Sequence, residues 1–146
     1  RGLRLRPDFD KGAHVYDLLA GEPVAVPHRM SVRLEPGEAG LWSALPYAVE
    51  GVAIAVPDEV ARGKRLRVGV TVETDREDAG RHLVRVRFGP VGGAWLAHYA
   101  KTLVCENGVG TMYIPLARNE ALGEYAIEVR DLLTGLHARA TTVVAS

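Results

Sequence analysis

The sequence is poor in cysteine, and this scarcity is the first constraint on its fold. Among 146 residues there is one cysteine, Cys105, so no disulfide can form within the chain. Other interactions must therefore hold the fold together. Cys105 follows two apolar residues, and free cysteine is among the most buried residue types. We therefore predict a buried, unreactive thiol rather than a nucleophile.

An excess of charge of one sign is also missing. Lys plus Arg number 18 and Asp plus Glu number 18, so the formal net charge is zero. A dedicated binder of nucleic acid or of an anionic membrane carries a basic excess, so we predict neither partner. Glutamine is absent and asparagine occurs twice, a composition typical of thermophilic proteins or of GC-rich genomes. Composition alone does not distinguish these two origins.

Long apolar segments are absent as well. No apolar run approaches the roughly 20 residues of a membrane-spanning helix, and no signal peptide is visible. The sequence therefore predicts no insertion into a membrane. Because the sequence starts with Arg1 rather than Met, we expect a processed protein or a piece of a longer one.

What the sequence has in abundance is alternation of apolar and polar residues. Segments 66–72, 82–88 and 125–129 place Val, Leu, Ile, His or an aromatic residue at every second position. This period is typical of half-buried β-strands, and Gly, Pro, Asn and Asp mark turns between them. Asn107-Gly108 is the sharpest turn signal and predicts a two-residue hairpin. The expected strands span residues 2–6, 13–18, 23–34 (with a break near Pro27), 39–46, 50–56, 65–74, 81–89, 95–104, 109–115, 123–131 and 136–144.

These strands predict an all-β protein, an antiparallel immunoglobulin-like β-sandwich preceded by a partial β-sandwich or an add-on sheet. The division is expected near Pro46, so that residues 1–47 and residues 48–146 form two units. The second unit has the strand number and length of one immunoglobulin-like sandwich, in which residues 58–62 form a loop. The first has too few strands to close its own core. It consists either of the closing strands of a preceding sandwich, which we favour, or of a sheet added to the second unit.

One motif occurs twice. Residues 15–21 read VYDLLAG and residues 129–135 read VRDLLTG. In each copy the Asp can hydrogen-bond the backbone ahead of it, and the Gly can take a positive φ. Each copy therefore predicts a strand, a tight turn and a returning strand. The copies do not stand in equivalent places, so they indicate shared turn chemistry, with a duplicated domain as the alternative.

Two regions of the sequence resemble known modules. Residues 16–47, with their YDLLAGE and VRLEPGEA segments, resemble the closing strands of C-terminal β-sandwich domains of bacterial glycoside hydrolases. Residues 50–146, with their GEYAI and DLLTG segments, resemble immunoglobulin-like or macroglobulin-like modules of large secreted proteins. The resemblance implies an accessory module whose catalytic domain lies upstream, and it carries no catalytic residue over to this chain.

No set of residues in the sequence specifies a chemical reaction. The five His lack the spacing of a zinc site, and the three Ser occur without a Gly-x-Ser-x-Gly elbow. His82 and His98 fall on neighbouring expected strands, but we favour ordinary strand histidines over a metal site. The acidic residues of segment 73–78 fall in an expected loop, and a solvated loop is favoured over a calcium site. We predict no enzyme activity, catalytic residue, metal or cofactor.

Aromatic side chains and arginines supply the remaining candidates. Exposed aromatic rings can stack on sugars, whereas Trp on the strands of a sandwich more often fills the core. The alternating arginines of segments 65–67 and 85–87 are expected to line one outward face, either solvated or contacting another domain or a polyanion. The candidate residues for carbohydrate or partner contact are Trp42, Tyr47, Trp95 and Tyr99.

Together these features predict a non-catalytic accessory or structural module of a larger extracytoplasmic protein, which mediates domain packing, spacing or adhesion. The expected location is extracellular or the cell surface. The expected partners are other domains of the parent protein, and carbohydrate or identical subunits are further candidates. One alternative is a self-assembling surface or filament subunit that donates residues 1–6 to a neighbour's sheet. The other alternative is a carbohydrate-binding module.

Overall fold

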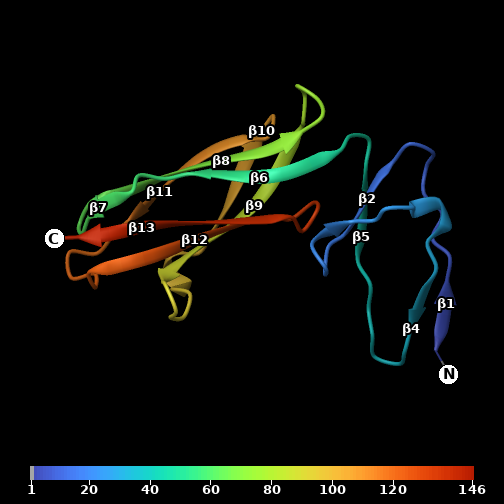
Figure 1. The fold of residues 1–146 in the computed structure, drawn as a ribbon, viewed down its shortest axis with the longest axis horizontal. Coiled ribbons are helices and arrows are strands. Elements are labelled where there is room, and N and C mark those ends of the chain that lie inside the picture. The colour runs from blue at the N-terminus through green and yellow to red at the C-terminus, as the bar shows by residue number, and fades with distance from the viewer. Residues whose placement is uncertain (1) are drawn as a thin grey trace.

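The computed structural model describes residues 2–146, which form strands and loops with two short 3-10 turns. Within these residues, an eight-stranded sheet curls into a sandwich at one end of a long molecule, and two small sheets lie at the other (Figure 1). This architecture confirms the predicted all-β class. The strands of the large sheet are β6 (Val49–Ala55), β7 (Glu59–Ala61), β8 (Arg65–Thr74), β9 (Arg81–Pro90), β10 (Lys101–Glu106), β11 (Val109–Pro115), β12 (Gly123–Asp131) and β13 (His137–Ala145).

The large sheet runs in the order β6-β8-β11-β10-β9-β12-β13-β7. Strands β6, β8 and β11 form one layer, and the hairpin from β10 to β11 continues the sheet into the opposite layer. The curl brings β6 close to β13, although the two strands stand far apart in the strand order. Neighbouring strands are antiparallel except β7 and β13, and the two layers joined in this way form a β-sandwich. The hairpin turns at Asn107 and Gly108, which both have positive φ, as the sequence predicts.

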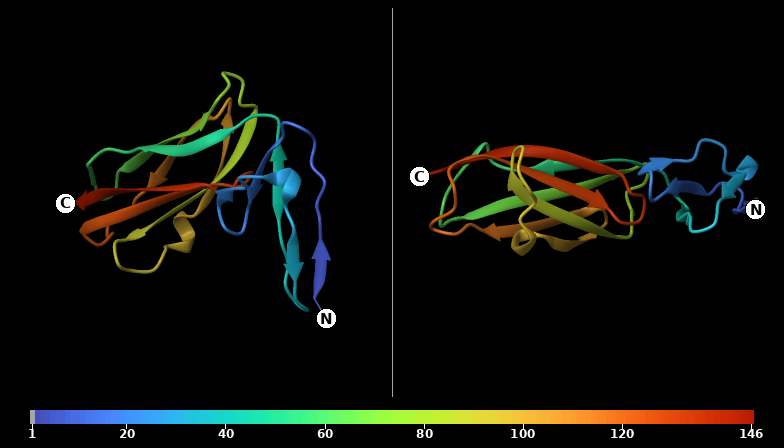
Figure 2. Two further views of the ribbon diagram at one scale, coloured as in Figure 1. Left: turned by 45° about the vertical axis from the view of Figure 1, so that its right-hand side comes forward. Right: turned by 90° about the horizontal axis from the view of Figure 1, so that it is seen from below.

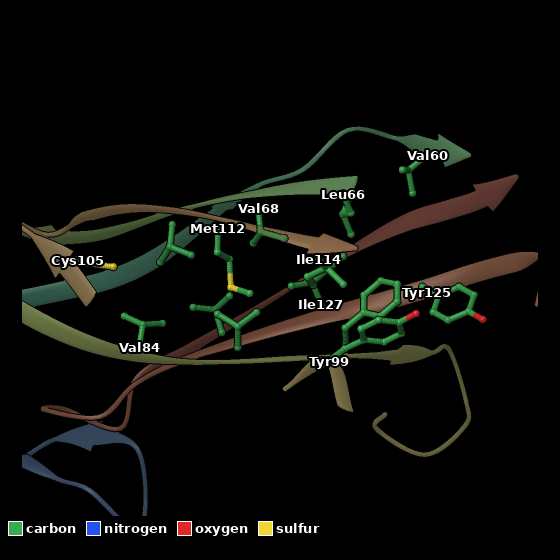
Figure 3. Packing of buried hydrophobic residues seen from close by; sticks show 14 of the residues in the cluster. Val60, Leu66, Val68, Val84, Tyr99, Cys105, Met112, Ile114, Tyr125 and Ile127 are labelled. Atoms are coloured by element: carbon green, nitrogen blue, oxygen red, sulfur yellow. The ribbon is translucent and has the colours of Figure 1, made fainter. Parts of the chain in front are cut away.

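Side chains from most strands of the large sheet fill the space between the layers, with the alternating residues of β8, β9 and β12 prominent among them (Figure 3). Phe88 is fully buried at the centre of an aromatic group, stacked on Tyr125 with ring centroids 4.8 Å apart and edge-on to Tyr99 at 5.5 Å. The intervening residues are mostly exposed on β8 and β9, whereas on β12 Ala126 is buried and Glu128 and Arg130 are partly exposed. The inward residues confirm the predicted period of two. The buried members are Leu66, Val68, Val70 and Val72 on β8, His82, Val84, Val86 and Phe88 on β9, and Tyr125, Ile127 and Val129 on β12.

Two predictions about this unit are wrong. Residues 58–62 were expected to form a loop, but Glu59–Ala61 pair in parallel with β13 as strand β7. A three-residue strand is too short to show a period, and its partner lies more than eighty residues away. The strand expected over 95–104 begins only at Lys101, because Ala97–Tyr99 form a 3-10 turn, η2.

Residues 2–45 form two small sheets. One has the order β3-β2-β5, and the other pairs β1 with β4 as a ribbon that projects away from the sandwich (Figure 2). The break predicted near Pro27 is confirmed as a 3-10 turn, since proline cannot donate to a ladder, and only the two ends of segment 23–34 are strand. The elements are β1 (Leu3–Leu5), β2 (His14–Asp17), β3 (Glu22–Pro23), η1 (Pro27–Arg29), β4 (Val32–Leu34) and β5 (Trp42–Leu45).

This N-terminal part has almost no core of its own. Between residues 2 and 45, the only buried hydrophobic side chains are Val15 and Tyr16. Leu3 and Leu41 are more than half exposed. The last strand of the small sheets ends just before Pro46, and the first strand of the large sheet begins at Val49. The division into domains 1–47 and 48–146 stays a prediction. Among residues 2–146, no helix is long and apolar enough to cross a membrane.

Candidate functional site: the junction between the two parts

The N-terminal sheets meet the sandwich through a tyrosine from β2. The Tyr16 side chain is 2% exposed and belongs to the core of the sandwich, not to a core of its own sheet. Its hydroxyl accepts a hydrogen bond from the Val49 N–H at 2.6 Å and donates one to the Val49 carbonyl at 3.2 Å. Burial raises the pKa of Tyr16 above its ordinary value, with the carboxylates Asp75 and Asp131 acting in the same direction. Tyr16 therefore plugs the end of the sandwich where β6 begins.

A second contact passes through a chain of buried polar groups. The Tyr47 hydroxyl donates to the Ala79 carbonyl at 2.7 Å and lies 2.9 Å from His82 Nε2. His82 Nδ1 lies 2.9 Å from Asp131 Oδ1, and the Thr134 hydroxyl donates to Asp131 Oδ2 at 2.7 Å. His82, Asp131 and Thr134 are 0% exposed. Burial raises the pKa of Tyr47, and the negative charge of Asp131 adds to the shift.

The order tyrosine, histidine, carboxylate also occurs in proton relays, but the surroundings here are different. A catalytic acid or base must come within hydrogen-bond reach of a substrate, directly or through one water. His82 and Asp131 have no exposed surface, and the Tyr47 hydroxyl already donates to the backbone. The arrangement instead satisfies buried polar groups and ties the segment after Pro46 to strands β9 and β12.

The two DLL turns share the same backbone hydrogen bond, while their aspartate side chains have different partners. Asp17 Oδ1 accepts from the backbone N–H groups of Leu19 and Ala20, both at 3.0 Å. In each turn the glycine N–H donates to the carbonyl of the aspartate four residues earlier, Gly21 to Asp17 and Gly135 to Asp131, both at 2.8 Å. This similarity agrees with the interpretation that the repeat reports shared turn chemistry.

The two turns also pack against each other (Figure 1). A Cβ on Gly21 would lie 2.6 Å from the Gly135 carbonyl oxygen, and a Cβ on Gly135 would lie 2.9 Å from Gly21 Cα. Both glycines also have a positive φ, which side chains disfavour. Glycine is therefore needed at both positions for the backbone conformation and for the close approach of the turns. Arg130 Nη2 donates to the Leu18 carbonyl at 2.7 Å, and the Ser43 hydroxyl donates to the Leu133 carbonyl. The repeated motif thus forms the two halves of the junction.

Comparisons with known proteins show similarity of fold. The sequence matches no protein-family model and no curated protein. A β-glucosidase from Listeria innocua is similar in structure, with 15% identity and a TM-score of 0.50 over 79% of this chain and 18% of that one. A Bacteroides uniformis β-glucuronidase has 12% identity and a TM-score of 0.39 over 98% of this chain and 26% of that one. A superoxide reductase from Ignicoccus hospitalis has 18% identity and a TM-score of 0.47 over 66% of this chain and 82% of that one.

At these identities the likeness concerns the fold alone. The chain spans less than a fifth of the length of the β-glucosidase. Glycoside hydrolases are thus among the similar structures, as the resemblance in the sequence led us to expect.

The structure does not bring the four candidate aromatic residues together. Tyr99 is 6% exposed, and its hydroxyl donates to Glu120 Oε2 at 2.6 Å inside the sandwich. Tyr47 lies in the junction, with its hydroxyl bonded to the protein. Trp42 lies on β5 with its ring against Gly40. Trp95 lies on the outer face of the sandwich beside two arginines. The four residues therefore lie at separate places in the fold and share no common surface.

The arginines expected on one face lie on two. Arg65 and Arg67 point outward from β8, and Arg85 and Arg87 point outward from β9. Strands β8 and β9 follow each other in sequence but belong to opposite layers, so their outer faces point in opposite directions. His82 and His98 do not meet either, because His82 is bound to Asp131 and His98 lies against Tyr99.

The acidic loop after β8 is bonded to the backbone. Asp75 accepts from the Ala48 N–H at 2.9 Å, and Asp78 accepts from the Gly80 N–H at 3.2 Å. Among the described residues, no group of three or more His, Cys, Asp or Glu is arranged to hold a metal ion.

Sequence reasoning missed the polar chain of the junction, although a signal for it exists. His82 and Asp131 both take the inward position of an alternating strand, where an apolar residue is expected. A polar residue at such a position needs a partner. Two of them on separate strands could therefore have been matched to each other.

Cys105 is fully buried, as predicted, and lies opposite His82 on the neighbouring strand β10. Burial, with a smaller contribution from Asp131, raises the pKa of its thiol from 9.0 to about 11.

We expect this thiol to make stability fall at alkaline pH. Above pH 9 the thiol of the unfolded chain loses its proton while the thiol of the folded chain keeps it. The free energy of unfolding therefore falls steadily as the pH rises from about 9 to about 11. The loss approaches about 2 kcal/mol by pH 11, and none occurs below pH 8. Denaturant unfolding across this range measures the effect. Cys105→Ala lowers stability at all pH values but has a shallower alkaline slope, and equal slopes would contradict the assignment.

Proposed function

We propose that the chain is a non-catalytic accessory module of a larger extracytoplasmic protein, in which the junction holds the N-terminal strands at a fixed orientation to the sandwich. The observation that carries the proposal is the contact between the two DLL turns. It combines two glycines that admit no side chain with hydrogen bonds from Arg130 and Ser43. Such a contact suits a rigid spacer between domains.

The exposed surface of the N-terminal part supports the same proposal. In the β1–β4 ribbon, Leu3 lies opposite Leu34 and Leu5 lies opposite Val32, so one face is apolar. A two-stranded ribbon is marginally stable at best in water. Another domain of the parent protein, packed on this apolar face, would complete a sandwich. The similarity in fold to part of a β-glucosidase fits this setting.

Rigidity of the junction can be measured directly. With spin labels at the exposed sites Ser31 and Thr111, we expect a single narrow distance distribution in the otherwise unaltered chain. Cys105 need not be removed, because it is buried. Gly21→Ala places a methyl group against the Gly135 carbonyl oxygen and is expected to broaden the distribution.

Gly12→Ala is the matched control. Gly12 also has a positive φ, but its Cβ would meet nothing within 4 Å, so backbone strain without the contact leaves the distribution narrow. A broad distribution in the unaltered chain would contradict the rigid spacer, and hydrolysis of aryl glycosides by the purified chain would contradict the non-catalytic role.

Self-assembly through the N-terminal strand is a second candidate. Within the described residues, β1 pairs with β4 alone, so its other edge is open to a neighbour. The segment proposed for donation, residues 1–6, includes Arg1, which lies outside the described residues. Light scattering separates the two roles, since an accessory module stays monomeric, whereas a filament subunit forms polymers that disappear when residues 1–6 are deleted.

A further inference from the structure

The outer face of strands β9, β12 and β13 carries two rows of charged side chains. Arg87, Glu128 and Arg139 lie opposite one another in the first row, and Arg85, Arg130 and His137 in the second. Residues directly opposite on adjacent strands point to the same side of the sheet. These six residues, which we call the cationic face, contain four arginines and one carboxylate.

The cationic face retains an arrangement that the fold alone does not favour. Arg85 and Arg130 are directly opposite, and like charges in this position are destabilising. Arg85 donates to the Thr102 hydroxyl at 3.3 Å and Arg130 to the Leu18 carbonyl, which are uncharged acceptors. Glu128 forms its ion pair with Arg87. The remaining three arginines have no carboxylate within salt-bridge distance among residues 2–146.

A tryptophan borders these charges. After β9 the chain folds back over the outer face, where a Cβ on Gly89 would lie 2.7 Å from the Ala94 carbonyl oxygen. Ala126, opposite Gly89, is 0% exposed although it points outward. The loop thereby places the Trp95 ring 4.9 Å from the guanidinium carbon of Arg87 and 5.3 Å from that of Arg139. The indole therefore contacts two of the four arginines of the cationic face.

We propose that the cationic face binds an acidic polysaccharide, a sugar chain that carries carboxylate or sulfate groups. Arginine presents a planar fork of donors that matches such anions. A partly exposed indole offers an apolar surface for the C–H face of a sugar ring. The two rows extend across three strands, so an extended chain can meet several arginines at once. This site shares Arg130 with the junction, and it retains only Trp95 of the four aromatic candidates.

Binding is tested by calorimetry on the full chain, with polygalacturonate, dextran sulfate and unmodified dextran as probes at low salt. We expect binding to one or both anionic polymers, weakened by added salt, and none to dextran. Tighter binding to polygalacturonate identifies carboxylates as the preferred group, and tighter binding to dextran sulfate identifies sulfates. Absence of binding to both polymers overturns the proposal.

Two double variants locate the site. Arg85→Gln with Arg139→Gln removes two exposed charges from the cationic face and is expected to weaken binding at least about tenfold. Arg65→Gln with Arg67→Gln removes two exposed charges from the opposite layer and should change affinity less than about twofold. Equal losses in the two variants would show attraction by overall charge and overturn the site.

A third variant tests the sugar specificity. Trp95→Ala is expected to weaken binding of the preferred polysaccharide while circular dichroism shows an intact fold. Two other polyanions serve as controls. Polyaspartate has no sugar rings, and duplex DNA has a different backbone geometry. If either binds as tightly as the polysaccharide, or if Trp95→Ala binds unchanged, the cationic face is a general anion site and the proposal fails.

Discussion

Replacing Asp131 by alanine is expected to lower the free energy of unfolding by about 3–5 kcal/mol. The Asp131 carboxylate is 0% exposed and bonds to His82 through one oxygen and to the Thr134 hydroxyl through the other. Its removal leaves His82 Nδ1 and the Thr134 hydroxyl hydrogen buried without their partner, although His82 Nε2 keeps its contact with Tyr47, and each unpaired group carries a desolvation penalty. Equilibrium unfolding in urea measures the change, provided that the transition remains two-state.

The first copy of the motif supplies the matched control. Asp17→Ala replaces the aspartate at the equivalent position of the first turn, where the side chain bonds only to exposed backbone N–H groups. We expect a loss of about 1 kcal/mol, as for an exposed capping residue. If the two variants lose the same stability, the buried network does not stabilise the sandwich in the way the geometry indicates.

Replacing Phe88 by alanine is expected to cost about 3–5 kcal/mol. Phe88 has no exposed surface and packs between Tyr125 and Tyr99, so its removal opens a cavity in the aromatic group. The tyrosine hydroxyls are held by Glu120 and by the Ala121 carbonyl, which limits how far the rings can move to fill the space. The same unfolding experiment gives the change in free energy and in midpoint.

Leu83→Ala, on the same strand, is the control. It introduces the same alanine into the strand without opening a cavity in the core. Leu83 points outward and is 40% exposed, so a loss of less than about 1 kcal/mol is expected. A Phe88→Ala variant as stable as Leu83→Ala would mean that the core repacks without a cavity.

Much of the sandwich could be predicted because its strands alternate. Strands β8, β11 and β12 have the predicted bounds, and their inward residues form the core. The sequence gives no comparable signal for β7, whose three residues are strand only because β13 lies beside them. In the N-terminal part, proline and glycine interrupt the pattern and tertiary contacts decide where each short strand begins.

The functional surfaces were harder to predict, because they depend on which strands become neighbours. Arg85 and Arg87 were grouped with Arg65 and Arg67 by closeness in sequence, but their neighbours in space are Arg130 and Arg139. The two DLL motifs were recognised as similar turns, yet nothing in their spacing shows that they touch. Alternation reports which side of a strand is buried, whereas the order of strands in a sheet comes from the fold as a whole.

The contact between the two turns has a consequence for the order in which the chain can fold. Ser43 and Leu133 are 90 residues apart and Leu18 and Arg130 are 112 apart, so the contact forms only after a very large loop closes. On a ribosome the N-terminal strands emerge well before the turn that receives them. These strands are therefore fixed against the sandwich only after the hairpin of β12 and β13 has been synthesised.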